Sequence, residues 1–289
     1  KNGGLISLRY KGKEILDRKP NLVFYRASTD NDRGCQYMYD SGIWEFVERW
    51  QRCIDFKVEE TDTKVVVRYT YELPISEDSV LIVADKREKP SKSAGKENKG
   101  NGRKGIRTEI VYTVTADGKV NISLHYHGAK GLPELPLFGM EFPLKREFEQ
   151  FAYYGIGPDE NYVDRNNGGK IGIFASTVTE NYSPYLKPQS CGNRTETRWL
   201  ELSDGEGKIR FSADVQGRPF QFTALHYRES ELENAMHTGD LPAENYTYVK
   251  ILAKHMGVGG DDSWGSQVRE NCRVTAEEDI LYSFDITME

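Results

Sequence analysis

The feature that most constrains this chain is a succession of short segments in which apolar and polar residues alternate. The clearest covers residues 64–73, KVVVRYTYEL, which is rich in β-branched and aromatic side chains. A period of two places alternate side chains on one face, and this predicts half-buried β-strands. Segments with strand character span residues 5–9, 13–16, 22–26, 56–60, 64–72, 79–84, 106–115, 119–127, 137–143, 148–154, 170–177, 197–202, 209–214, 221–227, 246–255 and 281–287.

The connections between these segments favour antiparallel pairing. Lys11-Gly12 and Asp117-Gly118 are turn signals between neighbouring segments. No repeat of 20–50 residues is present, which argues against a propeller. We therefore predict an all-β fold, a large antiparallel β-sandwich with one short helix.

The one predicted helix covers residues 44–53, WEFVERWQRC. Trp44, Val47 and Trp50 recur at every third position, and Asp40 or Ser41 would cap its first turn. In contrast, residues 27–34, ASTDNDRG, are rich in turn formers and charges, so we expect a turn there.

No linker divides the chain, so we predict a single domain over residues 1–289. Residues 85–105, DKREKPSKSAGKENKGNGRKG, interrupt the pattern because they are strongly charged and almost free of apolar side chains. We expect a solvated, flexible hairpin tip there. A patch for nucleic acid or heparin is the alternative.

Composition excludes several classes of protein. The net charge of −6 does not suit a nucleic-acid binder, which needs a basic face. No apolar run approaches the roughly 20 residues that span a bilayer. The opening KNGGLISLRY is no signal peptide and lacks Met, so we expect a processed protein or a fragment.

The cysteines have no zinc-type spacing and are predicted to be free, mostly buried thiols: Cys35, Cys53, Cys191 and Cys272.

Residues 256–265, MGVGGDDSWG, are the first candidate functional segment. The glycines, including Gly259 and Gly260, permit a tight loop. Such a loop can hold Trp264 as a platform for the apolar face of a sugar ring. The alternative is that Trp264 only covers the edge of a sheet. Asp261 and Asp262 follow the glycines, and we expect them to support the loop.

Other chemistries find little support in the sequence. Residues 155–165, GIGPDENYVDR, lack the third glycine of a dinucleotide fingerprint, so we expect a rigid polar network there. Asp30-Asn31-Asp32 lacks the rest of a calcium loop, and no metal site is predicted. No zinc-protease or serine-hydrolase motif occurs, and no spacing singles out a catalytic pair of carboxylates.

Four segments together resemble the C-terminal domain of bacterial β-galactosidases of glycoside hydrolase family 2. They are FYRASTDNDRG (24–34), YYGIGPDENYVDR (153–165), YLKPQSCGNRTETRWL (185–200) and HMGVGGDDSWG (255–265). The likeness extends from about residue 2 to the end. The departures are Ser28, where proline is usual, Cys191 before the GNR, and the charged stretch.

The resemblance implies a supersandwich related to galactose mutarotases, working within a larger bacterial enzyme. The catalytic glutamates would lie on an upstream (β/α)₈ barrel that is absent here, so no catalytic residue is expected in this chain. Trp264 would stack on galactose, and Asp30, Asn31, Asp32 and Arg33 would precede a mobile edge of the active site at residues 34–41. No cofactor is expected here, with Mg²⁺ and Na⁺ reserved for the full-length enzyme.

Three hypotheses follow. The first is part of a β-galactosidase, inert alone, whose partners are a β-galactoside, the catalytic barrel of its own full-length chain and, in full-length form, further copies of itself. The second is a free-standing carbohydrate-binding module. The third is a mutarotase-like epimerase, which would need a histidine acid, His226 or His255, and a carboxylate base in one pocket. The sequence does not distinguish a cytoplasmic from a periplasmic location.

Overall fold

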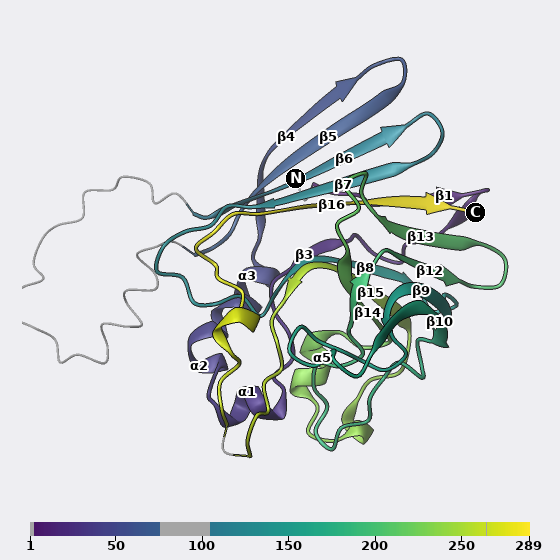
Figure 1. Ribbon diagram of the computed structural model, residues 1–289. Coiled ribbons are helices and arrows are strands. Elements are labelled where there is room, and N and C mark those ends of the chain that lie inside the picture. Colours follow the sequence, from purple (N-terminus) through teal and green to yellow (C-terminus); the bar gives the residue numbers. More distant parts are fainter. Residues whose placement is uncertain (1–2, 76–104, 264) are drawn as a thin grey trace, which may run out of the picture.

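Two antiparallel β-sheets of unequal size face each other in the computed structural model, which describes residues 3–75, 105–263 and 265–289 (Figure 1). The larger sheet has nine strands and the smaller has five. The predicted antiparallel sandwich is therefore confirmed. Trp264, the strand expected at 79–84 and residues 85–104 of the charged stretch lie outside the described residues.

The larger sheet carries strands from both ends of the chain. In spatial order it consists of β10 (Lys170–Thr177), β9 (Gln150–Gly157), β12 (Trp199–Ser203), β13 (Lys208–Ala213), β16 (Ile280–Met288), β7 (Val120–Tyr126), β6 (Arg107–Thr115), β5 (Lys64–Glu72) and β4 (Arg52–Glu60). The smaller sheet consists of β11 (Arg194–Thr197), β14 (Phe220–Leu225), β15 (Tyr246–His255), β8 (Leu137–Lys145) and β3 (Asn21–Val23). The short pair β1 (Arg9–Tyr10) and β2 (Lys13–Glu14) closes the hairpin predicted at Lys11-Gly12.

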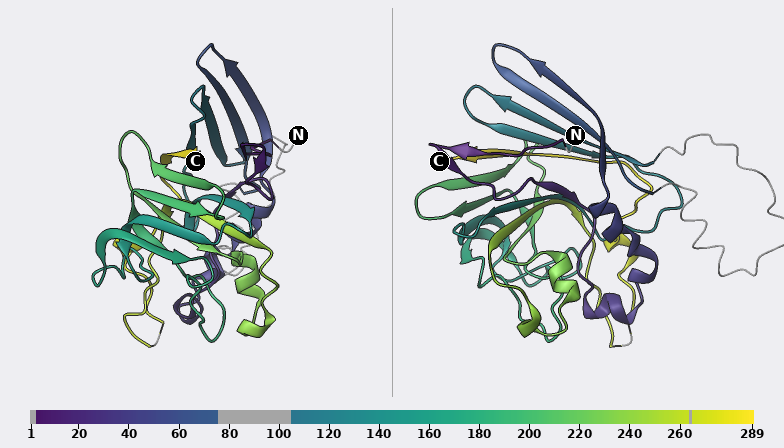
Figure 2. Two further views of the ribbon diagram at one scale, coloured as in Figure 1. Left: turned by 90° about the vertical axis from the view of Figure 1, so that its right-hand side faces the viewer. Right: turned by 180° about the vertical axis from the view of Figure 1, so that it is seen from behind.

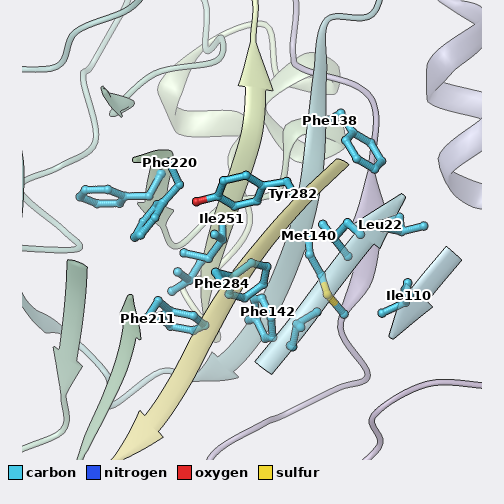
Figure 3. Packing of buried hydrophobic residues seen from close by; sticks show 14 of the residues in the cluster. Leu22, Ile110, Phe138, Met140, Phe142, Phe211, Phe220, Ile251, Tyr282 and Phe284 are labelled. Atoms are coloured by element: carbon cyan, nitrogen blue, oxygen red, sulfur yellow. The ribbon is translucent and has the colours of Figure 1, made fainter. Parts of the chain in front are cut away.

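The core lies between the two sheets, where apolar side chains from both sheets pack against one another. β7 alternates strictly between buried and partly exposed residues. Phe142 of the smaller sheet packs against Phe211 of the larger one, with ring centroids 5.0 Å apart, and Phe284 contacts both rings (Figure 3). Each such ring removes enough apolar surface from water to contribute about 1.5–3 kcal/mol.

Helices gather on the side of the smaller sheet, as two further views confirm (Figure 2). They are α1 (Asp30–Gly34), α2 (Met38–Ser41), α3 (Ile43–Arg49), α5 (Glu229–Asn234) and the 3₁₀ turns Thr238–Asp240 and Glu270–Cys272. No helix in the described part of the chain is long and apolar enough to cross a membrane.

Several boundaries differ from the prediction. The expectation of one helix is wrong, because 27–34 contains α1 and because α2 and α5 are also present. Helix α3 ends at Arg49, and its N-cap is Gly42, so neither Asp40 nor Ser41 caps it. The predicted strand 197–202 is two strands, since the chain leaves the smaller sheet after Thr197 and enters the larger one at Trp199.

The four cysteines are free, as predicted. Only Cys191 is buried, so the expectation of mostly buried thiols is wrong for the other three. Burial raises the pKa of the Cys191 thiol to about 12, which keeps it protonated and unreactive near neutral pH.

Candidate functional site

Helix α1 is fixed by its own first turn. Thr29 is the N-cap: its hydroxyl accepts a hydrogen bond from the backbone N–H of Asp32, and the carboxylate of Asp32 accepts one from the backbone N–H of Thr29. This reciprocal capping box satisfies donors that a helix end would otherwise leave unpaired. A capping box explains why a sequence rich in turn formers becomes a helix here.

A fully buried ion pair joins α1 to the glycine-rich segment. The Arg26 guanidinium donates to both carboxylate oxygens of Asp32, at 3.1 and 2.8 Å, and to the carbonyl oxygen of Met256 at 3.1 Å. Burial alone would lower the pKa of Arg26, but the attraction of Asp32 raises it. Removing either partner would leave a buried charge uncompensated, at a typical cost of about 3–5 kcal/mol.

The start of the glycine-rich loop is clamped by Asp164, which lies between β9 and β10. Its carboxylate accepts hydrogen bonds from the backbone N–H groups of Val258 at 3.0 Å and Gly259 at 2.8 Å. A Cβ at Gly257 would lie 2.2 Å from an oxygen of Asp164, so this approach requires glycine.

The end of the same loop rests on α1. Asn31 Nδ2 donates to the carbonyl oxygen of Ser266 at 3.0 Å. Gly265 has φ +83°, and a Cβ there would lie 2.5 Å from the carbonyl carbon of Gly34. The two glycines therefore let α1 and the loop meet backbone to backbone.

The two aspartates of the loop make local contacts. Asp261 accepts a hydrogen bond from Arg269 Nε at 2.9 Å. Asp262 accepts from the hydroxyl of Ser266 at 2.6 Å and from its backbone N–H at 3.1 Å. Both carboxylates thus accept hydrogen bonds from residues close to them in sequence, while Gly260, with φ +90°, has open space around it.

The exposed side of α1 contacts a second of the four resembling segments. Gln189 accepts a hydrogen bond from the backbone N–H of Asp30 at 2.7 Å and donates to the Asp30 carboxylate at 3.3 Å. Arg33 pairs with Asp30 at 3.2 Å and reaches Glu233 of α5 at 4.0 Å. The motif residues Asp30 to Arg33 thus lie at a junction of three segments.

The polar segment 155–165 forms the network that the sequence predicts. Glu160 accepts from the backbone N–H of Gly192 at 2.8 Å, from Arg165 at 2.9 Å and from the hydroxyl of Tyr185. Asn161 accepts from the backbone N–H of Thr195 at 2.9 Å. These bonds tie the segment to residues 185–195 and leave its polar groups satisfied.

A cleft of about 320 Å³ opens between α1, α2 and the segment that follows the glycine-rich loop. Tyr37, Asp40 and Ser41 line one side, and Gln267 and Arg273 line the other. Residues 34–41, expected at the edge of an active site, therefore border a real cleft.

Beneath α1 lies a buried charge cluster that sequence reasoning missed. Lys250 of β15 contacts Glu229 of α5 at 2.5 Å, and Glu229 also accepts from the backbone N–H of Ala27 at 2.7 Å. Burial would lower the pKa of Lys250, but Glu229 and then Glu141 raise it. Alternation places Lys250 on the face of β15 opposite to the core residues Val249 and Ile251, so the sequence pattern gives no signal that Lys250 is buried.

The two histidines considered for an epimerase do not share a site. His226 follows β14 and contacts Glu149 at 2.9 Å and the carbonyl oxygen of Tyr246, the first residue of β15. His255 is the last residue of β15, so the two lie at opposite ends of that strand. Burial, and then Arg26 and Lys250, hold the pKa of His255 well below its ordinary value, so it stays neutral.

Comparison with protein families gives one match, covering residues 1–288, to the family described as beta galactosidase small chain. The chain is 36% identical over 287 residues to a β-galactosidase of Halalkalibacterium halodurans, covering 98% of this chain and 26% of that protein. It is 36% identical to a β-galactosidase of Lactobacillus delbrueckii subsp. bulgaricus, covering 96% and 24%. The chain thus spans about a quarter of the length of these relatives.

A shorter relative is covered over most of its length by this chain. The β-galactosidase small subunit of Latilactobacillus sakei is 34% identical over 316 residues, covering 99% of this chain and 90% of that protein. Among solved structures, a galactose mutarotase-like protein from Lactobacillus casei covers 96% of this chain and 90% of its own, at 12% identity and a TM-score of 0.44. That score is too low for the two sites to be compared.

Proposed function

The chain belongs to the beta galactosidase small chain family, and we propose that it is the non-catalytic part of an enzyme that hydrolyses terminal β-D-galactosides. In this proposal it docks on a catalytic barrel that is either a separate large chain or the upstream part of one long chain. The barrel supplies the catalytic glutamates and any Mg²⁺ or Na⁺, and the assembled enzyme associates with further copies of itself. This chain supplies one wall of the sugar site.

Trp264 is the residue proposed to contact sugar, through the apolar face of galactose. The anchoring of its neighbours supports this role. Asp164 fixes residues 258–259 by two backbone hydrogen bonds, and Asn31 fixes Ser266 by one. The close approach of Gly265 to Gly34 fixes the residue that follows Trp264. A fixed backbone on both sides of a binding residue lowers the entropy lost when a ligand orders that residue.

The decisive experiment measures hydrolysis of an aryl galactoside by this chain, by the barrel-containing chain and by their mixture. We expect activity only in the mixture. Trp264→Ala in the mixture should lower kcat/KM by about tenfold, the equivalent of about 1.4 kcal/mol of lost stacking. Trp50→Ala, which removes a tryptophan exposed at the end of α3, is the matched control.

Two outcomes would overturn the proposal. One is hydrolysis by the purified chain alone, and the other is full activity of the mixture that carries Trp264→Ala. A galactose titration of the isolated chain, followed by fluorescence, tests the binding-module alternative. Saturable binding that Trp264→Ala removes would favour that module, because it would show a sugar site complete without the barrel.

A further inference from the structure

A second group of chemically suggestive residues lies on the outer face of the larger sheet, far from the glycine-rich loop in sequence. β6, β7 and β16 run side by side there (Figure 1). Ile122, Leu124 and Tyr126 of β7 point into the core. His125 and His127 alternate with them, so both imidazoles emerge on the opposite, outer face. Their ring centroids are only 3.7 Å apart.

Two carboxylates flank this histidine pair, and each is anchored through one oxygen. Glu109 of β6 is directly opposite His125 in the sheet. Its Oε2 accepts from Arg68 at 2.9 Å, while its Oε1 lies 3.8 Å from His127 Nε2. Asp279, which precedes β16, accepts from the backbone N–H of Gly128 through Oδ1 at 2.9 Å. Its Oδ2 lies 2.7 Å from His125 Nε2.

The spacing of these side chains is close to that of the ligands of a metal ion. A ligand atom from each of Glu109, His125 and His127 lies within 4.8 Å of the others. Ligands about 2.0–2.2 Å from a tetrahedral zinc ion lie about 3.3 Å apart, so side-chain shifts of about an ångström close the site. Two adjacent imidazoles, tilted by 39° to each other, and the anchored carboxylate of Glu109 supply the N and O ligands that zinc accepts.

We propose that Glu109, His125 and His127 bind a divalent transition-metal ion such as Zn²⁺, with Asp279 positioning the ring of His125. Three protein ligands leave a fourth position for water, as in open zinc sites. The side chains of His125 and His127 are 24% and 37% exposed, so the ion can enter from solvent. The bound ion would link β6 to β7 and hold the start of β16.

The sequence predicts no metal site in this chain, because it shows only two histidines separated by one residue. Glu109 and Asp279 come from separate parts of the chain, and only the register of β6 with β7 brings Glu109 opposite His125. The proposal does not depend on Trp264 or on the β-galactosidase activity. If the metal site is disproved, the proposed role in β-galactosidase activity is unaffected, and the reverse also holds.

Calorimetric titration of zinc chloride into the whole, tag-free, metal-stripped chain tests the proposal. We expect one saturable site per chain. His127→Ala and Glu109→Gln should weaken binding by more than about a hundredfold, and Asp279→Asn by about 10–100-fold, as for residues that orient metal ligands. His237→Ala should leave binding unchanged, because His237 is an exposed histidine with one carboxylate neighbour, Asp240.

A second measurement, of thermal unfolding, distinguishes a variant that has lost zinc binding from a variant that has failed to fold. Thermal unfolding of the metal-stripped proteins shows whether each variant is folded, and added zinc should raise the Tm of the wild type but not that of folded His127→Ala. The proposal is overturned if zinc does not saturate the wild type, or if His237→Ala weakens binding as much as His127→Ala. It is equally overturned if Cys272→Ser abolishes zinc binding, because the zinc would then be bound by that thiol and not by the histidines.

Discussion

Glu48 makes the stability of the fold depend on pH. Burial, and then repulsion by Glu141, raise the pKa of its carboxyl group to about 8. Its Oε2 accepts a hydrogen bond from the backbone N–H of Phe24 at 3.1 Å, so it holds the connection between β3 and α1. The folded state therefore holds a proton on Glu48 at pH values where the unfolded chain has released it.

This difference predicts a pH dependence of stability with a definite sign. The contribution of Glu48 is complete below its unfolded pKa of about 4.3 and is lost as pH rises through about 8, with a slope of at most about 1.4 kcal/mol per pH unit. Glu48→Gln should remove that slope. Urea unfolding at pH 5, 6, 7 and 8 measures it. Glu45→Gln on the same helix, which removes a partner of Arg49, is the control. Equal slopes for wild type and Glu48→Gln would contradict the assignment.

Among the structural elements, the start of the glycine-rich loop is held by the carboxylate of Asp164, which belongs to another loop. Asp164→Ala would leave the N–H groups of Val258 and Gly259 without their acceptor. We expect the free energy of unfolding to fall by about 1–3 kcal/mol, and amide exchange at these two positions to accelerate. Asp159→Ala, an exposed aspartate of the same connection, should change stability by less than about 0.5 kcal/mol. Unchanged exchange in Asp164→Ala would show that the clamp is not needed.

The elements also show what the sequence could predict. Strand patterning in the sequence locates β5 and β15 at their observed bounds, although β15 buries residues on both of its faces. It fails at 197–202, where Arg198 separates two strands in different sheets and only tertiary packing reveals the crossing. Helix α1 was missed because five residues carry too little periodicity, and the capping box is visible only once Asp32 is known to turn back to Thr29.

The sequence predicts which segments form the candidate site but not which side chains hold those segments together. The motif residues mark the segments that meet, namely α1, the 155–165 connection and the glycine-rich loop. The roles of Arg26 and Asp164 were not apparent, because neither has a sequence neighbour that identifies its partner. Arg26 is separated by 230 residues from the carbonyl oxygen of Met256 that it contacts.

At the scale of the whole molecule, the unequal sheets leave part of the larger one uncovered. β4 is one of the two edge strands of the nine-stranded sheet, and the hairpin of β4 and β5 extends beyond the smaller sheet (Figures 1 and 2). Phe56 and Val58 of β4 are 64% and 56% exposed. Within the described residues β4 pairs only with β5, and an edge strand with exposed apolar side chains is a template for pairing with another chain.

The isolated chain should therefore self-associate through β4 as its concentration rises. A lysine on an edge strand opposes such pairing by placing charge where two strands would meet. Phe56→Lys should raise the concentration needed for association by at least about tenfold, equivalent to about 1.4 kcal/mol of lost contact energy. Sedimentation velocity over a concentration series measures this shift. Val215→Lys replaces a still more exposed valine in the turn after β13, away from any strand edge, and should leave association unchanged. Equal effects of the two variants would show that general surface charge, rather than the edge of β4, controls association.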